Sequence, residues 1–410
     1  MRLYVLSLRN LLRKPKRTGL TLATIIVSLS TLMILGGYYE YNYWGLRESF
    51  IRSQLAHIQV YPKAYLDNRD VNPYRYSLPQ DEAFLEFFDS LAEVQIASPR
   101  VIYWAVLEGS EDASELIEVR GVIPERENLV NTFFTYKRGH DLSSRFPHGA
   151  ELGKSLAESL NVRPGDDFFL SVVQESGAHN YDSFTARSVI GSYSSEFDAR
   201  ILRIPMEAAQ HLAGFYGYQE LVLLLSKDAA IAEVVAVIQA RAERAEWDLH
   251  VTTWEEHAGY YAQVVSFYGG YFKIIFIIVG VLSFFSIFNA LLMAYFERIT
   301  ELGTLRSFGM PQSVLVRIML LEGVWLGIAG TLGAYVCTLV LAAVTNAVGG
   351  IPMPPPPGLT TSVDVMIRLT PNLFVTSAAL GICISVFASI LPICKTLSMS
   401  IMDQIHYNEA

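Results

Sequence analysis

The chain has 410 residues, of which 51% are hydrophobic and 17% are charged, and its formal net charge at pH 7 is −9. This length allows more than one domain, and the acidic balance excludes a general nucleic-acid-binding protein, because neutralising phosphates requires clustered Lys and Arg. Cys337, Cys383 and Cys394 all lie in or beside apolar segments, and the histidines lack metal-ligand spacing. No disulfide framework and no metal site is therefore expected in the polar middle of the chain.

Four segments of about 20 uncharged residues predict membrane-spanning helices, because a helix of that length crosses about 30 Å of hydrocarbon. The expected spans are residues 18–39, 272–296, 315–348 and 372–394. A cleaved signal peptide would also begin with a basic region, but the first apolar segment is too long and no small-residue cleavage site follows it. We therefore expect an uncleaved first span.

Basic residues fix the expected orientation of these spans. Residues 1–17 predict an amphipathic helix leading into the first span, and its basic residues place it in the cytoplasm. These residues are Arg2, Arg9, Arg13, Lys14, Lys16 and Arg17. Four crossings then put residues 297–314 and the tail 395–410 in the cytoplasm, and residues 40–271 and the proline-rich loop 349–371 outside.

Residues 40–271 predict an extracytoplasmic α+β domain, in which strand patterns alternate with short amphipathic helices. Two strand patterns, 167–174 and 183–193, predict a hairpin. We expect its tip to contain Glu175, Ser176, Gly177, Ala178, His179 and Asn180.

Residues 148–155 imitate the phosphate-binding loop GxxxxGK[ST]. His148 stands where the first glycine belongs, and no apolar strand pattern precedes the segment. We expect a turn leading into a helix rather than a nucleotide site. The chain has no recognisable catalytic constellation either, so we expect no catalytic residues and a non-enzymatic function.

The cytoplasmic segment 295–330 reads YFERITELGTLRSFGMPQSVLVRIMLLEGVWLGIAG and predicts a short helix before a break at Gly309-Met310-Pro311. Its residues fit either a plain connecting loop or a helix that docks on a partner. The segment resembles the signature of the FtsX-like permease family of MacB and LolC/LolE type, RxxE[IL]GxLR[AS][LF]G followed by LxEG. The matching residues are Arg298, Glu301, Leu302, Gly303, Leu305, Arg306, Phe308, Gly309, Leu321, Glu322 and Gly323.

The resemblance extends over nearly the whole chain. Residues 7–22 are similar to the family's amphipathic helix and first span, and residues 58–65, 120–127 and 151–166 are similar to segments of MacB-like periplasmic core domains. The tail departs from the family, because Ser400 stands where a proline is usual.

This resemblance implies the permease subunit of a type VII ABC transporter with 1+3 span topology, in a bacterial inner membrane. It implies that the loop helix is a coupling helix, docking on a separate cytoplasmic ABC ATPase present in two copies, which uses the ATP and Mg while this chain binds no cofactor. The implied ATPase-coupling residues are Glu297, Arg298, Glu301, Leu302, Gly303, Leu305, Arg306, Phe308 and Gly309. Motion would pass through stalk helices to the outer domain. A second permease copy is also implied, and a homodimer and a heterodimer of paralogues both remain open.

Three residues within the spans are expected to serve packing or coupling. Asn289 predicts a hydrogen bond between helices, and Glu322 is favoured as a packing or coupling residue over a proton relay. Gly323 accompanies Glu322 in the motif.

The substrate stays open between lipoprotein or lipid release, MacB-like efflux of a drug, peptide or siderophore, and FtsX-like regulation of a periplasmic hydrolase. The hairpin tip is a candidate contact for a periplasmic carrier or adaptor. The proline-rich loop fits either a cap over a substrate region or a stiff spacer.

Overall fold

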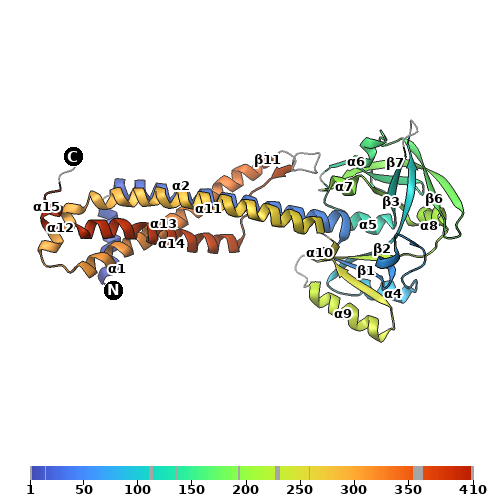
Figure 1. Cartoon of the computed structure of the whole chain (residues 1–410), viewed down its shortest axis with the longest axis horizontal. Helices are drawn as coiled ribbons and strands as arrows, with labels where there is room; N and C mark the ends of the chain where they lie inside the picture. Colours follow the sequence, from blue (N-terminus) through green and yellow to red (C-terminus); the bar gives the residue numbers. More distant parts are fainter. Residues whose placement is uncertain are drawn as a thin grey trace. The chain divides into compact units, whose positions relative to one another are not determined.

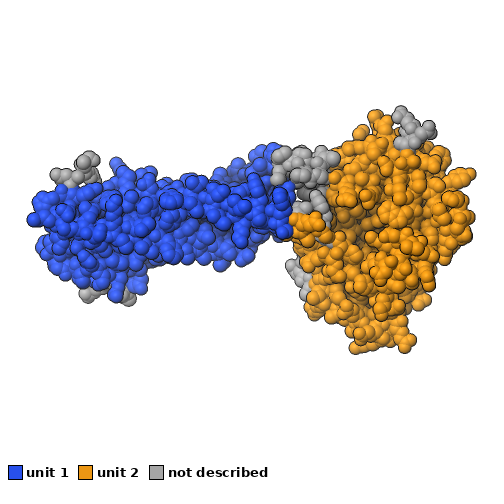
Figure 2. All heavy atoms as spheres, viewed as in Figure 1, with its two compact units in different colours: residues 1–43, 266–352, 364–410 blue, residues 44–265, 353–363 orange. Residues whose placement is uncertain are grey.

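The chain folds into two compact units (Figure 2). Residues 1–43, 266–352 and 364–410 form the first, here the helical unit, and residues 44–265 and 353–363 form the second, the sheet unit. The computed structural model describes residues 2–13, 15–109, 114–134, 136–192, 194–226, 231–257, 259–353 and 363–407. The central part of the predicted proline-rich loop, residues 354–362, therefore lies outside the described residues.

The helical unit is built from long helices (Figure 1). Its helices are α1 (Arg2–Arg13), α2 (Pro15–Phe50), α11 (Gly259–Phe296), α12 (Ile299–Ser307), α13 (Gln312–Ala347), α14 (Pro371–Ser398) and α15 (Ile401–Ile405). Four helical segments are long and apolar enough to cross a membrane, in agreement with the four predicted spans; they are Thr18–Leu55, Tyr261–Phe296, Gln312–Ala347 and Pro371–Ser398. Helices α2 and α11 continue without a break beyond the helical unit into residues of the sheet unit.

Small residues allow these helices to pack closely. A Cβ on Gly330 of α13 would overlap Ile25 of α2, and a Cβ on Gly381 of α14 would lie 2.7 Å from Leu29. Residues of α2, α11, α13 and α14 contribute to one buried apolar cluster, which includes Ile25 and Leu29. Absence of a side chain at these glycines is what lets the helices approach.

The sheet unit contains one large sheet with short helices around it. Its strands are β1 (Ile58–Pro62), β2 (Val94–Glu108), β3 (Ser114–Val122), β4 (Tyr136–Gly139), β5 (Gly149–Gly153), β6 (Asp167–Val173), β7 (His179–Gly191), β8 (Ile201–Pro205), β9 (Glu220–Leu225) and β10 (Leu249–Thr253). Its helices are the π-helix η1 (Ile51–Leu55), α3 (Tyr65–Asn68), α4 (Glu82–Asp89), α5 (Pro124–Val130), α6 (Lys154–Ser159), α7 (Ser195–Asp198), α8 (Met206–Ala213), α9 (Ile231–Arg244) and α10 (Trp254–His257). Strands β11 (Ile351–Met353) and β12 (Val363–Val365) form a separate pair.

Six of the strands close into a ring. Strand β2 pairs with β3, β3 with β8, β8 with β5, β5 with β7, β7 with β6, and β6 again with β2. The first half of β2 pairs instead with β9, which continues the sheet to β1 and β10. The 15-residue strand β2 thus belongs to both a small barrel and an open sheet.

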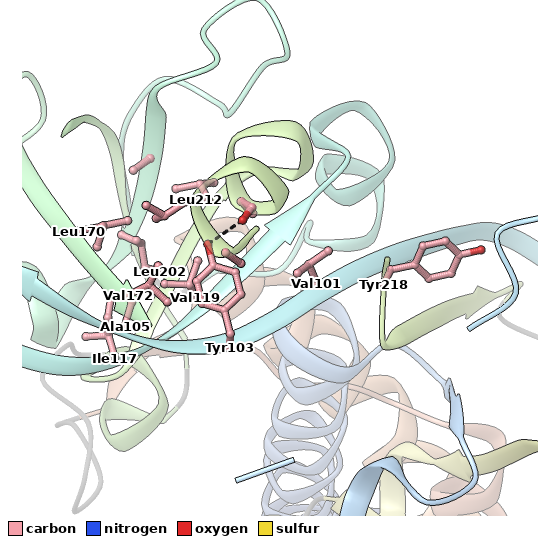
Figure 3. Packing of buried hydrophobic residues seen from close by; sticks show 14 of the residues in the cluster. Val101, Tyr103, Ala105, Ile117, Val119, Leu170, Val172, Leu202, Leu212 and Tyr218 are labelled. Carbon is pink, nitrogen blue, oxygen red and sulfur yellow. Dashed lines mark hydrogen bonds between the residues drawn. The ribbon is translucent and has the colours of Figure 1, made fainter. Parts of the chain in front are cut away.

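Apolar side chains fill the barrel, as a ring of this size requires. Ala105, Ile117 and Val172 gather in its interior (Figure 3). The hydroxyl of Tyr103 donates a hydrogen bond of 3.1 Å to the carbonyl of Ala209, which ties the barrel core to α8.

The segment that imitates a phosphate-binding loop differs from the prediction. Residues Gly149–Gly153 form the buried strand β5, where a turn was expected, and α6 follows directly. The sequence hides this strand because its central residue is the acid Glu151, which is buried against Arg203 at 3.0 Å. A Cβ on Gly153 would overlap the backbone of Asp198, so the glycine serves close packing here.

We predict that Gly330→Val separates α2 from α13 and lowers the stability of the helical unit by about 1–3 kcal/mol, the usual cost of overpacking. The measurement is thermal unfolding of the detergent-solubilised full chain. Gly280→Val in α11 is the matched control, because a Cβ there meets nothing within 4 Å. Equal melting temperatures for the two variants would contradict the packing argument.

Candidate coupling site

The predicted coupling helix is α12, a nine-residue helix between two short breaks. Glu297 and Arg298 form the turn before it. After it, Gly309 adopts a φ of +89°, a conformation that favours glycine, and Pro311 caps α13 in an extended conformation. The chain can therefore reverse direction within a few residues.

The inner face of α12 is fixed on the C-terminal tail. Leu302 and Gly303 are buried, and Gly303 lies so close to Gln404 of α15 that a Cβ would be 2.7 Å from it. Arg306 donates a hydrogen bond of 3.0 Å to the carbonyl of Met399. Gln404 donates to the carbonyl of Thr396, which joins α15 to α14. The C-terminal tail thus contacts the buried face of α12 and holds this helix in place.

The opposite face of α12 is open and mostly polar, but it carries Leu305, and the apolar Phe308 follows directly at the end of the helix. Phe308 is 85% exposed and Leu305 is 39% exposed. Apolar side chains in such positions are costly in water and are typical of surfaces that bind a partner.

A buried ion pair connects the start of α12 to α13. Glu322 is only 2% exposed, and its carboxylate lies 2.8 Å from Nη1 of Arg298 and 3.1 Å from the amide nitrogen of Asn10 in α1. Arg298 also lies 3.4 Å from Glu301. Burial alone lowers the pKa of Arg298, but these two carboxylates raise it overall. The contact from Asn10 was not predicted from the sequence.

These groups line a cavity of about 160 Å³ between α1, α2, α11 and α13, whose wall also contains apolar residues such as Leu291 and Leu326. Asn10, Arg298, Glu301 and Glu322 all contribute to its wall. The ion pair thus ties Arg298, the residue directly before α12, to both α1 and α13. Gly323, next to Glu322, packs on Ser389 of α14, where a Cβ would lie 3.1 Å from the hydroxyl oxygen.

The hydrogen bond between helices that was predicted for Asn289 stays a prediction. Asn289 lies on the exposed face of α11, and its side chain has no hydrogen-bond partner among the residues that the structure describes. Ile287 and Leu291 of α11 point into the core. Asn289, midway between them in the sequence, lies on the opposite side of the helix.

A second polar cluster lies in the sheet unit, where α2 and η1 end. The carbonyl of Gln54 accepts hydrogen bonds from Arg100 in β2 at 2.9 Å and from Arg120 in β3 at 3.2 Å. The carbonyl of Ser53 accepts one from Arg203 in β8 at 2.5 Å. We call these three arginines and two carbonyls the helix-end anchor. The last carbonyls of a helix lack partners within it, and they carry the negative end of its dipole, so cations are favoured there.

Buried carboxylates balance the arginines of the anchor. Arg100, fully buried, lies 2.7 Å from Glu127 and 3.2 Å from Glu220, and Arg203 lies 3.0 Å from Glu151. Burial alone would raise the pKa of the Glu127 carboxyl. The guanidinium groups of Arg100 and Arg203 together outweigh burial and lower this pKa to about 2. Because this pKa is depressed in the folded chain, the stabilisation is present above the ordinary carboxyl value of 4.5 and is lost as the pH falls towards 2.

The predicted hairpin tip belongs to the same unit and is exposed. Strands β6 and β7 form the hairpin, with His179 and Asn180 already at the start of β7. The amide of Asn180 donates 3.0 Å to the carbonyl of Leu212, and the backbone N–H of Glu175 donates 3.2 Å to Ala213. The tip is thus held on the end of α8.

Comparison with known proteins decides the family. Residues 18–241, more than half of the chain, match the MacB-like periplasmic core domain, and residues 273–401 match the FtsX-like permease C-terminal domain. The chain belongs to the FtsX-like ABC transporter permeases of MacB and LolC/LolE type. Its four spans and α+β periplasmic domain therefore agree with the predicted fold class.

Two named relatives of this permease are distant. It is 23% identical over 354 residues to the lipoprotein-releasing system transmembrane protein LolC of Neisseria meningitidis serogroup B, covering 80% of each chain. It is 22% identical over 266 residues to the transmembrane protein LolE of the same kind of system in Haemophilus influenzae, covering 63% of each chain. The periplasmic region of MacB from Actinobacillus actinomycetemcomitans aligns at 11% identity with 51% of the permease and 92% of that region, at a TM-score of 0.36.

We predict that Arg298→Ala destabilises the permease by about 3–5 kcal/mol, because Glu322 is left buried without its cation. Thermal unfolding of the full chain measures this effect. The double variant with Glu322→Leu should recover part of the loss, which a simple loss of side-chain packing would not allow. Arg200→Ala is the control, because its partner Glu196 is largely exposed.

The helix-end anchor gives a parallel prediction. Arg203→Met keeps most of the side-chain volume but leaves Glu151 buried and unpaired, so we expect a loss of about 3–5 kcal/mol in chemical unfolding of the full chain. Lys63→Met breaks an ion pair with Asp248 in which both side chains are exposed, and it should change stability by less than about 1 kcal/mol. Similar losses in both variants would show that burial of the anchor is not what stabilises it.

Proposed function

We propose that this permease subunit transmits ATPase-driven motion from its cytoplasmic helix α12 to the periplasmic domain, in a bacterial inner membrane. The observation that carries the proposal is the two-sided character of α12. Its inner face is fixed to α15, while Leu305 and Phe308 are open on the outside. A partner that binds this outer face pushes on a supported element rather than on a loose loop.

The partner that fits is a cytoplasmic ABC ATPase, in two copies. The segment that resembles a nucleotide-binding loop contains the buried strand β5, which supports a separate nucleotide-binding partner. ATP and Mg would be bound by the partner. The motif residues around Arg298 and Glu322 support this reading, since they join α12 to α1 and α13 through buried polar contacts.

Continuous helices offer a route for the motion. Helix α2 contributes residues to both units and ends in the helix-end anchor, and α11 also contributes to both. A packed helix moves as a rigid element, so displacement of the first span is delivered to the strands that hold its end.

The exposed amide of Asn289 supports a second permease copy. A polar side chain facing hydrocarbon is costly unless a neighbouring helix supplies a hydrogen-bond partner. In the proposed assembly α11 of one copy faces a helix of the other. A homodimer and a heterodimer both satisfy this requirement.

The proposed cargo is a lipoprotein, a lipid or another hydrophobic substrate. The names of two relatives, both lipoprotein-releasing transmembrane proteins, support lipoprotein release over MacB-like efflux and over control of a periplasmic hydrolase. The exposed hairpin tip, from Glu175 to Asn180, remains the proposed contact for a periplasmic carrier or adaptor.

We predict that Phe308→Ser reduces copurification of an ATPase with the permease about tenfold or more, as expected for an exposed aromatic anchor of an interface. Tagged wild type and variant are purified from the native host, and the bound ATPase is quantified by mass spectrometry. Val348→Ser is the control, because Val348 is equally exposed at the far end of α13. Undiminished copurification with Phe308→Ser, or no ATPase with the wild type, would refute the proposed docking.

A further inference from the structure

Several outward-facing positions of the barrel carry apolar side chains. Along a barrel strand, alternate residues point inward and outward, and the outward ones are normally polar when they face water. Here the inward set fills the core, yet six of the outward positions on β2, β3, β6 and β7 are also apolar, beside polar ones such as Ser171 and Glu118. These apolar residues are Trp104, Val106, Leu116, Phe169, Val173 and Tyr181, which we call the barrel face.

Strand register makes the barrel face continuous. Leu116 lies opposite Val106, Val106 lies opposite Ser171, and Ser171 lies opposite Tyr181. These residues therefore form one row across four strands, and Phe169 stands beside it in the next row. Neighbouring strands are about 5 Å apart, so the row forms one surface rather than scattered contacts.

The exposure of this face is unusual for a protein surface in water. Leu116 is 62% exposed, Phe169 is 53% exposed and Tyr181 is 76% exposed. A contiguous apolar patch rimmed by polar groups marks a binding surface, and aromatic residues are enriched in interfaces. A groove of about 500 Å³ runs along it, between Trp104, Leu116 and Val173.

Acidic residues border the barrel face. Glu175 and Asp70 line the groove, and Glu108 lies opposite Phe169. Neither Glu108 nor Glu175 forms an ion pair with a residue that the structure describes, and the described lining of the groove includes no Lys or Arg. Asp70 lies 3.7 Å from Arg69, so the uncompensated negative charge of the rim comes from Glu108 and Glu175.

The negative charge of the rim favours some binding partners of the barrel face over others. A second copy bound symmetrically would place Glu108 and Glu175 close to identical acids, which is unfavourable. An anionic membrane surface is repelled in the same way. A protein with apolar side chains ringed by Lys and Arg complements both the patch and its rim.

We propose that the barrel face is the docking surface for a separate extracytoplasmic protein that presents an apolar centre within a basic rim. The acids steer and orient this partner, and Leu116, Phe169 and Tyr181 are buried against it. The proposal extends the proposed function by giving an extracytoplasmic partner a surface on the strands, with Glu175 of the hairpin tip at the edge of that surface. It requires no ATPase, so it and the coupling proposal can fail separately.

The test replaces Leu116, and separately Tyr181, by the photocrosslinker p-benzoyl-phenylalanine in the full-length chain. Intact cells of the native host are irradiated, and each product is identified by mass spectrometry together with the residues at the crosslink. Position Val237, an exposed apolar residue on α9, is the matched control. The same positions are then tested in a Glu108→Lys/Glu175→Lys background and at raised salt.

We expect both barrel-face positions, but not Val237, to crosslink the same extracytoplasmic protein at an apolar site flanked by Lys or Arg. Charge reversal should lower the yield about tenfold, and raised salt should lower it as well. Crosslinks to a second copy or to lipid, no product above the control, a contact site without basic residues, or a yield unchanged by charge reversal would each overturn the proposal. The result of the Phe308→Ser copurification experiment does not change how these crosslinking results are interpreted.

Discussion

The helix-end anchor is the interaction on which the periplasmic domain depends. A helix that ends inside a folded domain leaves carbonyl groups without partners, and each one buried in that state costs free energy. Arg100, Arg120 and Arg203 satisfy the last carbonyls of the first span's helix, and they come from three different strands. The same arginines hold buried carboxylates on β5, β9 and α5, so one cluster joins the helix to both the barrel and the open sheet.

The helical unit uses a similar arrangement at the end that carries α12. Glu322 is buried in α13, and its two partners, Arg298 and Asn10, come from the turn before α12 and from α1. Apolar packing between spans is tolerant of small sliding movements, whereas a buried ion pair with defined partners has few alternative positions. Both units therefore hold the ends of helices through buried polar contacts, which stand apart from the apolar packing around them.

Hydropathy and local motifs were sufficient to predict the four spans, the break at Gly309 and the α+β character of the periplasmic domain. They were insufficient where a residue's role depends on distant partners. Arg100 and Arg203 interrupt apolar strand patterns and suggest exposure, but each is buried by carboxylates far away in the chain. Strand β5 was not recognised because it contains the acid Glu151, which is buried only through its pairing with the distant Arg203. The exposed position of Asn289 on α11 could not be predicted from the sequence either, because an unbroken apolar helix has no polar face from which its rotation can be inferred. Closure of the barrel depends on the pairing of β2 with β6, which no local pattern encodes.

The anchor also limits how the end of the helix can turn within the sheet unit. Ser53 and Gln54 are successive residues of η1, so their carbonyls lie at different positions around the helix axis. Arginines on three strands donate hydrogen bonds to these two carbonyls. Rotation of η1 about its own axis would therefore break hydrogen bonds to buried arginines or displace the strands that carry them, so the anchor fixes the rotation of the helix end as well as its position.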